Sequence, residues 1–172
     1  MSAIADFGHY GYLLFTPNGI LYDLKNFGAH QIHAIHIHEF GDTSHGCASL
    51  GGHYNPTGQP HGHHLGDLVF NFKTDRYGRA TFETPLLGLD VEDIYGRSVV
   101  IHKFADDLGV VGELIRDYPL LSDEDLGTLC RERGYKNTNT RAKRIQKLVQ
   151  ESMSNGNAGE RITCAIIGRR KF

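Results

Sequence analysis

Histidines are concentrated in one segment of this chain, between His30 and Asp67. Nine of the 11 histidines lie there, among many glycines. The candidate ligands of this segment are His36, His38, His53, His61, His63, His64 and Asp67. Imidazole and carboxylate groups are poor material for a hydrophobic core, but they are usual protein ligands of zinc and copper. The segment therefore predicts a metal site.

The spacing of these residues predicts two ions. Side chains alternate between the two faces of a strand, so His36 and His38 point the same way, and a glycine-rich loop can bring later imidazoles to them. Together the residues offer more donors than one tetrahedral zinc needs. An all-nitrogen set suits Cu(II), whereas three histidines and one aspartate suit Zn(II). The alternative is a solvated histidine-rich loop with loose metal affinity.

Short strands separated by turn residues must position this segment. The runs that predict strands are 10–16, 20–24, 68–72, 80–84, 99–103 and 162–167. Asn18-Gly19 predicts a hairpin between the first two, because both residues tolerate positive φ. The turn residues at 75–78 predict a second hairpin, between 68–72 and 80–84. Strands of this length and spacing are typical of an antiparallel sandwich or barrel.

Size and charge limit the class of protein further. A chain of 172 residues, 40% hydrophobic and 22% charged, predicts one globular domain over 1–172. The net charge of −2 implies no general attraction to nucleic acid or to a membrane surface, so neither is an expected partner. The chain has no apolar run that could span a bilayer and no leader pattern at Met1, so we expect a cytoplasmic protein.

Three blocks of the chain resemble the copper/zinc superoxide dismutase family. They are the histidine-rich block 36–67, the block GRSVVIHKFADDLG at 96–109 and the block GNAGERITCAIIG at 156–168. The blocks occur in the order that the family has. The resemblance implies an all-β fold, a flattened eight-stranded antiparallel Greek-key barrel. Its first strand would come from about Ser2 to Phe7; in the family this strand contributes to the dimer contact, and here it is short, so both a homodimer and a monomer stay open.

The resemblance also implies a complete set of metal ligands. Copper would be bound by His36, His38, His53 and His102, and zinc by His53, His61, His64 and Asp67. His53 would bridge the two ions as an imidazolate, which requires two dications to compensate the charge.

For two histidines, the match to the family motif decides whether they are metal ligands. His64 is preferred over His63 at zinc, because His64-Leu-Gly-Asp67 keeps the pattern of the family. On its own, His102 on an apolar strand is more typical of a core histidine than of a ligand, and only the surrounding motif makes it a ligand. The remaining histidines near the site, His30, His33 and His45, are expected to be exposed or hydrogen-bonded elsewhere.

Three further roles follow from the resemblance. Asp106 would accept hydrogen bonds from one copper histidine and one zinc histidine, and so fix their orientation. Cys47 and Cys164 would form a disulfide, although the composition alone predicts reduced thiols, because cytosolic disulfides are rare. Cys130 is expected to be a free thiol.

Arg161 resembles the arginine beside the copper channel of the family, where a fixed guanidinium would attract and orient the superoxide anion. Its alternative role is that of a surface arginine in an ordinary ion pair. Asn155 stands where the family usually has a threonine that flanks the channel, which predicts altered anion access.

An additional segment of about 113–153 departs from the family and predicts a helical hairpin near the C-terminus. Ser122 can cap a helix that begins with Asp123 and ends before Gly134, with Leu126, Leu129 and Cys130 on one face. A second helix is predicted from about Thr140, with an apolar stripe of Ala142, Ile145, Val149 and Met153. Between Arg131 and Lys147 the hairpin has seven lysines or arginines and one acid. This basic run could be an ordinary solvated face, a field that attracts superoxide, or a docking or nucleic-acid surface.

The function that the resemblance implies is superoxide dismutation. Two superoxide anions would be converted to oxygen and hydrogen peroxide through a copper redox cycle, with His53 exchanging a proton and zinc holding His53 in place. Two alternatives from other classes remain: a non-catalytic copper/zinc-binding module for metal buffering or delivery, and an adaptor that uses the basic hairpin. Both can dispense with a copper ligand or with the channel arginine, whereas this sequence keeps His102 and Arg161.

Overall fold

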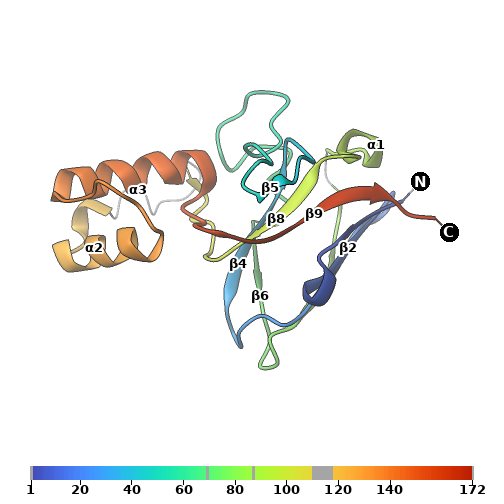
Figure 1. Ribbon diagram of the computed structural model, residues 1–172, viewed down its shortest axis with the longest axis horizontal. Coiled ribbons are helices and arrows are strands. Elements are labelled where there is room, and N and C mark those ends of the chain that lie inside the picture. The colour runs from blue at the N-terminus through green and yellow to red at the C-terminus, as the bar shows by residue number, and fades with distance from the viewer. Residues whose placement is uncertain (1, 69, 87, 110–117, 172) are drawn as a thin grey trace.

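The fold is an antiparallel barrel with a pair of helices at one end (Figure 1). The computed structural model describes residues 2–68, 70–86, 88–109 and 118–171. Its strands are β1 (Ala3–Asp6), β2 (Gly11–Thr16), β3 (Gly19–Leu24), β4 (Ile32–His38), β5 (Ser44–Cys47), β6 (Phe70–Lys73), β7 (Ala80–Thr84), β8 (Ser98–His102) and β9 (Arg161–Arg169). Its helices are η1 (Gly8–Tyr10), α1 (Val91–Ile94), η4 (Tyr118–Leu120), α2 (Asp123–Glu132) and α3 (Arg141–Asn155).

Eight strands form one sheet in the order β6-β4-β8-β9-β1-β2-β3-β7, and every described pairing is antiparallel. The sheet curls into a nearly closed barrel whose interior is packed with apolar side chains from alternate positions, such as Leu13 and Phe15 of β2 and Tyr22 and Leu24 of β3. The predicted all-β, eight-stranded antiparallel barrel is confirmed. The short first strand, predicted at about 2–7, is β1 and pairs with both β2 and β9.

One of the two predicted hairpins is confirmed and the other is wrong. β2 and β3 pair around the Asn18-Gly19 turn as predicted. β6 and β7, however, stand at opposite ends of the strand order, because β6 pairs with β4 and β7 with β3. The chain does reverse at 75–78, but this turn packs on the β3–β4 connection: the Phe27 amide donates to the Gly78 carbonyl and the His30 amide to the Asp75 carbonyl. The turn is therefore held by the β3–β4 connection, and the strands on either side of it do not pair with each other.

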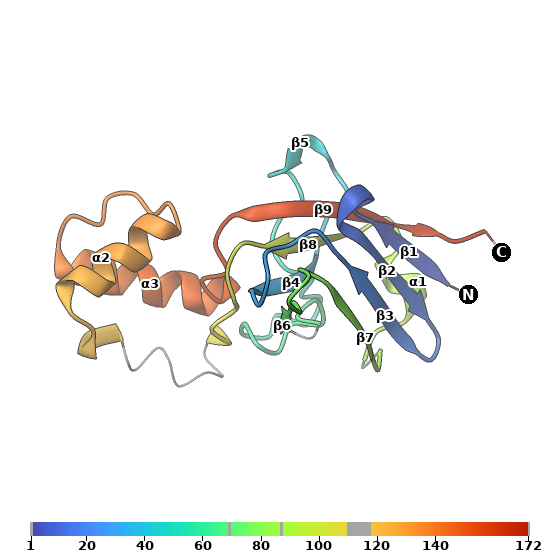
Figure 2. The ribbon, with the colours of Figure 1, turned by 90° about the horizontal axis from the view of Figure 1, so that it is seen from below.

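The two helices predicted near the C-terminus are present, and they lie beside the barrel at the end opposite the two chain termini (Figure 2). The side chain of Ser122 caps α2, and that of Thr140 caps α3. Gly134 follows α2 with a φ of 69°, the left-handed conformation that favours glycine after a helix. The helices share a small core of Tyr118, Leu126, Cys130 and Leu148, separate from the barrel core. The start of the predicted segment, 113–117, lies outside the described residues, and the single-domain assignment stays a prediction.

The apolar stripe predicted for α3 is partly wrong. Ile145 and Val149 pack against the hairpin core, but Ala142 is exposed and Met153 is 52% exposed. The buried side chains of α3 are Leu148 and Ser152. The hydroxyl of Ser152 donates to Asp107 at 2.7 Å, so a polar anchor sets the rotation of the helix, and apolar periodicity cannot reveal such an anchor.

Four short elements, η1, β5, α1 and η4, were not predicted, since each is three or four residues long and lacks a clear period. Within the part of the chain that the structure describes, no helix is both long and apolar enough to cross a membrane.

Candidate metal centre

Strand β4 carries two histidines on the face opposite its core residues. Ile35 and Ile37 belong to the barrel core, and the alternation of a strand therefore directs His36 and His38 to the other side. Both histidines are nevertheless buried, because the loop that follows β4 folds back over them and His53 forms a bridge with His38. The loop and the strand thus enclose a polar space outside the barrel.

Four imidazoles meet in this space: His36, His38, His53 and His102. Each offers one nitrogen, and these four nitrogens lie within 4.8 Å of one another. The nitrogens His36 Nδ1, His38 Nε2, His53 Nε2 and His102 Nε2 are all buried and have no hydrogen-bond partner. Buried polar atoms are normally paired, so four unpaired nitrogens that converge on one point fit a metal ion, and an all-nitrogen set suits copper.

The other ring nitrogens of this group are fixed by hydrogen bonds. His38 Nδ1 lies 3.0 Å from the carbonyl oxygen of Gly51, and His102 Nδ1 lies 3.1 Å from that of Gly159. A carbonyl oxygen can only accept, so each ring carries its proton on Nδ1 and presents a bare Nε2. Two rings of the four are therefore held in the tautomer that a metal requires.

A second group of donors lies beside the first and consists of His53, His61, His64 and Asp67, whose ligand atoms are also within 4.8 Å of one another. The Asp67 Oδ1 atom lies 2.8 Å from His53 Nδ1 and 3.2 Å from His64 Nδ1. His61 Nδ1 is buried without a hydrogen-bond partner. The other carboxylate oxygen, Oδ2, accepts from the amides of Gly62 and His64. Three imidazoles with one carboxylate are a donor set that fits tetrahedral zinc.

His53 is common to both groups, since its Nε2 belongs to the first and its Nδ1 to the second. Asp106 links them a second time. Its Oδ2 atom lies 2.7 Å from His36 Nε2 and 2.9 Å from His61 Nε2, and its side chain is fully buried. The structure thus brings Asp106 to one histidine of each group. This is the arrangement that the resemblance of the sequence motifs to the family implied.

The pKa values of the ligating groups are shifted in different directions. Burial lowers the pKa of His36 and of His38, and burial lowers the pKa of His102 to about 4, so these rings are neutral and able to bind a metal. Burial lowers the pKa of His64 in the second group, as it does in the first. Burial also acts on His61, but the hydrogen bond and the charge of Asp106 outweigh it and raise its pKa. Burial alone would raise the pKa of Asp67, yet the hydrogen bond from His53 and the nearby imidazoles lower it to about 2.

Arg161 stands opposite His102 because of a β-bulge. The β8–β9 register shifts between Ile101, which faces Thr163, and His102, which faces Arg161. Such a bulge redirects a side chain at the edge of a site. The half-buried guanidinium donates to the carbonyl oxygens of Cys47 at 2.6 Å and Gly51 at 2.7 Å. Gly51 O therefore orients both Arg161 and His38.

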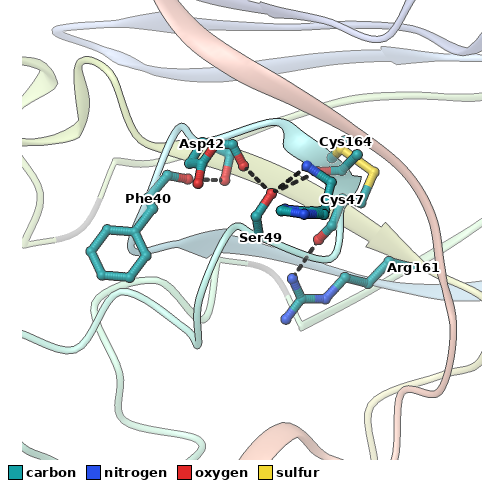
Figure 3. Close-up of a disulfide and its surroundings, with 9 residues drawn as sticks. Phe40, Asp42, Cys47, Ser49, Arg161 and Cys164 are labelled. Atoms are coloured by element: carbon teal, nitrogen blue, oxygen red, sulfur yellow. Dashed lines mark hydrogen bonds between the residues drawn. A yellow bond between two sulfur atoms is a disulfide. The ribbon is translucent and has the colours of Figure 1, made fainter.

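A disulfide between Cys47 and Cys164 ties the loop to β9 beside Arg161 (Figure 3). The expected pairing is thus present, against the reduced thiols that composition alone predicts. Ser49 strengthens the loop: its hydroxyl donates to the Asp42 carbonyl at 2.7 Å and accepts from the His45 amide. The carbonyl of Cys47 that accepts from Arg161 is consequently held by a covalent crosslink.

The remaining histidines lie outside both groups. His30, His45 and His63 are exposed, whereas His33 is buried and lies 2.9 Å from the His102 carbonyl. It is His64, not His63, that joins the second group. Cys130 is a free, buried thiol in the hairpin core. Asn155 donates to Glu151, and its predicted effect on anion access stays a prediction.

Sequence reasoning missed the residues that hold Asp106. The Asn71 side chain donates to the Asp106 carbonyl at 2.9 Å and accepts from the Asp106 amide at 2.6 Å. An asparagine on a predicted strand carries no signal of this role. The glycine carbonyls that orient His38 and His102 were missed too, because a main-chain acceptor is invisible in residue types.

Comparison with known proteins gives one consistent result. The family model described as "Copper/zinc superoxide dismutase (SODC)" matches residues 11–128. A "Superoxide dismutase [Cu-Zn]" of Talaromyces marneffei is 33% identical over 162 residues, which cover 89% of this chain and 81% of that protein. An "Extracellular superoxide dismutase [Cu-Zn]" of Rattus norvegicus is 36% identical over 153 residues; the match covers 86% of this chain but only 47% of that longer protein.

Among solved structures, the crystal structure of the clock protein EA4 resembles this one with a TM-score of 0.65 and 26% sequence identity. The match covers 97% of this chain and 93% of that one.

Proposed function

This chain belongs to the copper/zinc superoxide dismutase family and is an oxidoreductase that uses copper and zinc, and on that premise we propose how its own residues serve the reaction. Two superoxide anions and two protons give one oxygen and one hydrogen peroxide. His36, His38, His53 and His102 would bind copper, and His53, His61, His64 and Asp67 would bind zinc. When bound, copper supplies the one-electron transfer, and redox-inert zinc supplies fixed positive charge.

The observation that carries this proposal is the convergence of four buried, unpaired imidazole nitrogens on one point. A purely structural cluster would leave these nitrogens without partners at a cost of about 1–3 kcal/mol each. A second donor set shares His53 with the first. This sharing supports a paired site rather than two independent ones.

His53 is the residue proposed to handle a proton. Its Nδ1 faces Asp67 at 2.8 Å, so Nε2 is the nitrogen available to the copper group. We propose that Nε2 holds a proton in one half of the cycle and releases it to the reduced oxygen species in the other. The second proton of hydrogen peroxide comes from solvent.

Arg161 is proposed to attract and orient the anion. Two carbonyl oxygens hold its guanidinium in one orientation. The side chain therefore loses little conformational entropy when the anion binds. Its side chain lies next to His38 and His102, on whose pKa values its charge acts. A surface ion pair, the alternative role, has no support, since its described acceptors are carbonyl oxygens.

A non-catalytic metal-binding module is the second candidate. It would explain the two donor sets, but it has no use for a guanidinium fixed beside the copper group. An adaptor that acts only through the helices would have no use for either feature. Both donor sets and Arg161 together favour catalysis.

The test is superoxide decay measured by stopped flow on protein loaded with both metals, with metal content determined by elemental analysis. We expect one copper and one zinc per chain and rapid, catalytic decay. The His102→Ala variant is the control, because it lacks one copper ligand and keeps the zinc group. Full metal loading without catalytic decay would support the non-catalytic module instead.

A homodimer through the surface around Phe40 is also proposed. Phe40 is 49% exposed and its ring lies against Gly51, while Ile166, which is 41% exposed, lies against the neighbouring Gly41. Two exposed apolar side chains thus lie on or beside the same loop. Sedimentation equilibrium of the wild type and of Phe40→Asp tests this, and a monomeric wild type would refute it. A cytoplasmic location and the lack of nucleic-acid binding stay predictions.

A further inference from the structure

The basic residues of the hairpin are largely engaged within the hairpin itself. Arg141 donates to the carbonyls of Leu121 and Pro119 and pairs with Asp123, and Arg144 donates to the carbonyls of Thr138 and Asp123. These contacts join the start of α3 to the start of α2. These two arginines therefore stabilise the hairpin. The contacts that link the hairpin to the metal centre lie where it meets the barrel.

The hairpin meets the barrel at Asp106 and Asp107, two neighbouring acids whose carboxylates serve different partners. Asp106 faces the imidazoles of His36 and His61. Asp107 contacts no histidine among the described hydrogen bonds. Its oxygens accept from the Tyr118 hydroxyl at 2.6 Å, the Ser152 hydroxyl at 2.7 Å and the Asn157 amide at 2.9 Å, as well as from the Gly109 amide.

The side-chain donors to Asp107 all come from the helical segment or its end. Tyr118 belongs to η4 and Ser152 to α3, and Asn157 follows the C-cap residue of α3, Gly156. Ser152 and Asn157 are fully buried, and Tyr118 is nearly so. Burial, followed by the hydrogen bond to Asp107, raises the pKa of Tyr118, so the phenol keeps its proton and remains a donor. Asp107 is thus the polar centre through which the hairpin is attached.

The end of α3 also touches the metal centre sterically. Gly156 lies so close to Asp106 that a Cβ atom there would come within 1.9 Å of Oδ1. Gly109 lies between His61 and the Ser152 carbonyl, with predicted Cβ distances of 2.6 and 2.7 Å. The Asp107 amide donates to the Gly156 carbonyl at 2.8 Å. A shift of α3 would therefore move Asp106 and His61 with it.

The backbone directly after the two acids is strained. Leu108 has a φ of 66°, which is costly for a residue with a side chain. This conformation lets the Leu108 amide donate to Asp106 Oδ1 at 2.7 Å, while the Gly109 amide donates to Asp107 Oδ1 at 3.0 Å. Strain of this kind persists only where contacts on both sides enforce it.

We propose that Asp107 is a positioning residue, through which the helical hairpin holds the Asp106 carboxylate against His61 and His36. The hairpin is then a brace for the metal centre. This inference rests on the proposed assignment of zinc to the group that contains His61. It predicts that hairpin side chains remote from every ligand set the affinity for zinc.

The test compares pairs of variants that each lose one hydroxyl. Tyr118→Phe and Ser152→Ala remove donors to Asp107. Tyr95→Phe and Ser154→Ala are the matched controls: Tyr95 donates to the Ser2 carbonyl and Ser154 to the Glu151 carbonyl, so neither hydroxyl bonds to Asp107 or to one of its donors. Zinc affinity is measured by competition with a chelator, and Co(II) absorption reports the geometry of the same site. All measurements are made well below the unfolding temperature of each variant.

We expect Tyr118→Phe and Ser152→Ala each to weaken zinc binding severalfold and Asp107→Asn about tenfold, the lower end of the range for residues that support metal ligands. The Co(II) spectrum should shift in these variants and stay unchanged in both controls. Equal affinities and identical spectra across all variants, with only lower unfolding temperatures, would overturn the proposal. If the wild type itself binds no zinc at this site, the assignment of the metal centre fails instead.

Discussion

The two halves of the metal centre hold their imidazoles by different means. In the group that would bind copper, His38 and His102 are oriented by the carbonyls of Gly51 and Gly159. In the group that would bind zinc, His61 is oriented by the carboxylate of Asp106, and Asp67 by two amides of its own loop. His38 and His102 of the first half therefore depend on main-chain carbonyls in loops, whereas His61 of the second half depends on a carboxylate side chain that it shares with His36.

This difference teaches where each half is vulnerable. A side-chain substitution does not remove a main-chain carbonyl, provided that the backbone keeps its conformation. Copper binding should therefore be little affected by substitutions near His38 and His102. A carboxylate acceptor can be removed by one substitution, and Asp106 is in turn supported by Asn71 and the hairpin. The zinc half should therefore respond to many more positions in the chain.

The largest effect should come from breaking the residue that the two halves share. His53→Ala should lower superoxide decay by more than about a hundredfold, since even residues that only support metal ligands cost 10- to 100-fold. Elemental analysis should show weaker binding of both metals. His63→Ala is the control, because His63 is exposed and outside both groups. If His63→Ala instead lost zinc, the choice of His64 would be wrong.

The disulfide anchors the loop that carries the carbonyls of Cys47 and Gly51, which accept from Arg161. It closes a loop with a sequence separation of 117 residues, and replacing both Cys47 and Cys164 by serine should lower the free energy of unfolding by about 4–5 kcal/mol. Arg161 should also lose its fixed position, because its acceptor Cys47 O would be freed. Denaturant unfolding measures the first effect, and Cys130→Ser serves as the control. A double variant as stable as the control would contradict the prediction.

Asp106→Asn should act on the zinc half far more than on the copper half. We expect zinc affinity to fall by about 10- to 100-fold, because His61 loses the carboxylate that orients it, whereas His38 and His102 of the copper half keep their carbonyl acceptors. Chelator competition measures each metal separately. Asp42→Asn, an exposed loop carboxylate, is the control. Equal losses of copper and zinc would remove the proposed difference between the halves.

A smaller effect is expected for Arg161→Gln, which leaves both halves intact. The rate of superoxide decay at low salt should fall by about tenfold, and its dependence on ionic strength should flatten, because the attraction of the anion is lost. Arg169→Gln, an exposed arginine on the same strand, removes the same charge elsewhere. The two variants behaving alike would show that only net charge matters.

Proton titration of the metal-free protein should sharpen the comparison without any substitution. The pKa of His102 is lowered to about 4, mainly by burial, whereas the pKa of His61 is raised by Asp106. The unfolded chain binds a proton at a histidine pKa of about 6.5, so His102 lowers stability as the pH falls from 6.5 towards 4. His61 does the opposite: its stabilising effect is present at low pH and is lost as the pH rises through its raised pKa. NMR titration of the ring protons measures both, and the reverse order of the two pKa values would contradict the assignment.

Much of the fold and of the site could be predicted from local sequence. The Asn18-Gly19 hairpin, the caps at Ser122 and Thr140 and the alternation in β4 are local effects that depend on a few neighbouring residues. The pairing of β6 with β4, and of β7 with β3, could not be predicted. Turn residues mark where the chain reverses, but they do not identify the distant strand with which each flanking strand pairs. Ser152 could not be predicted as a core residue, since its burial depends on an acceptor 45 positions away.

The sequence by itself determined the donor types and that they exceed the needs of one ion, because ligand chemistry is a property of side chains and short spacings; the division into two ligand sets, with His102 in the first, came from the resemblance to the family. Only the tertiary structure decided that a bulge sets Arg161 opposite His102, that Asn71 holds Asp106, and that the hairpin ends against the metal centre at Asp107. Those contacts join segments far apart in the chain, and they form only where the folded backbone leaves a buried polar group in need of a partner.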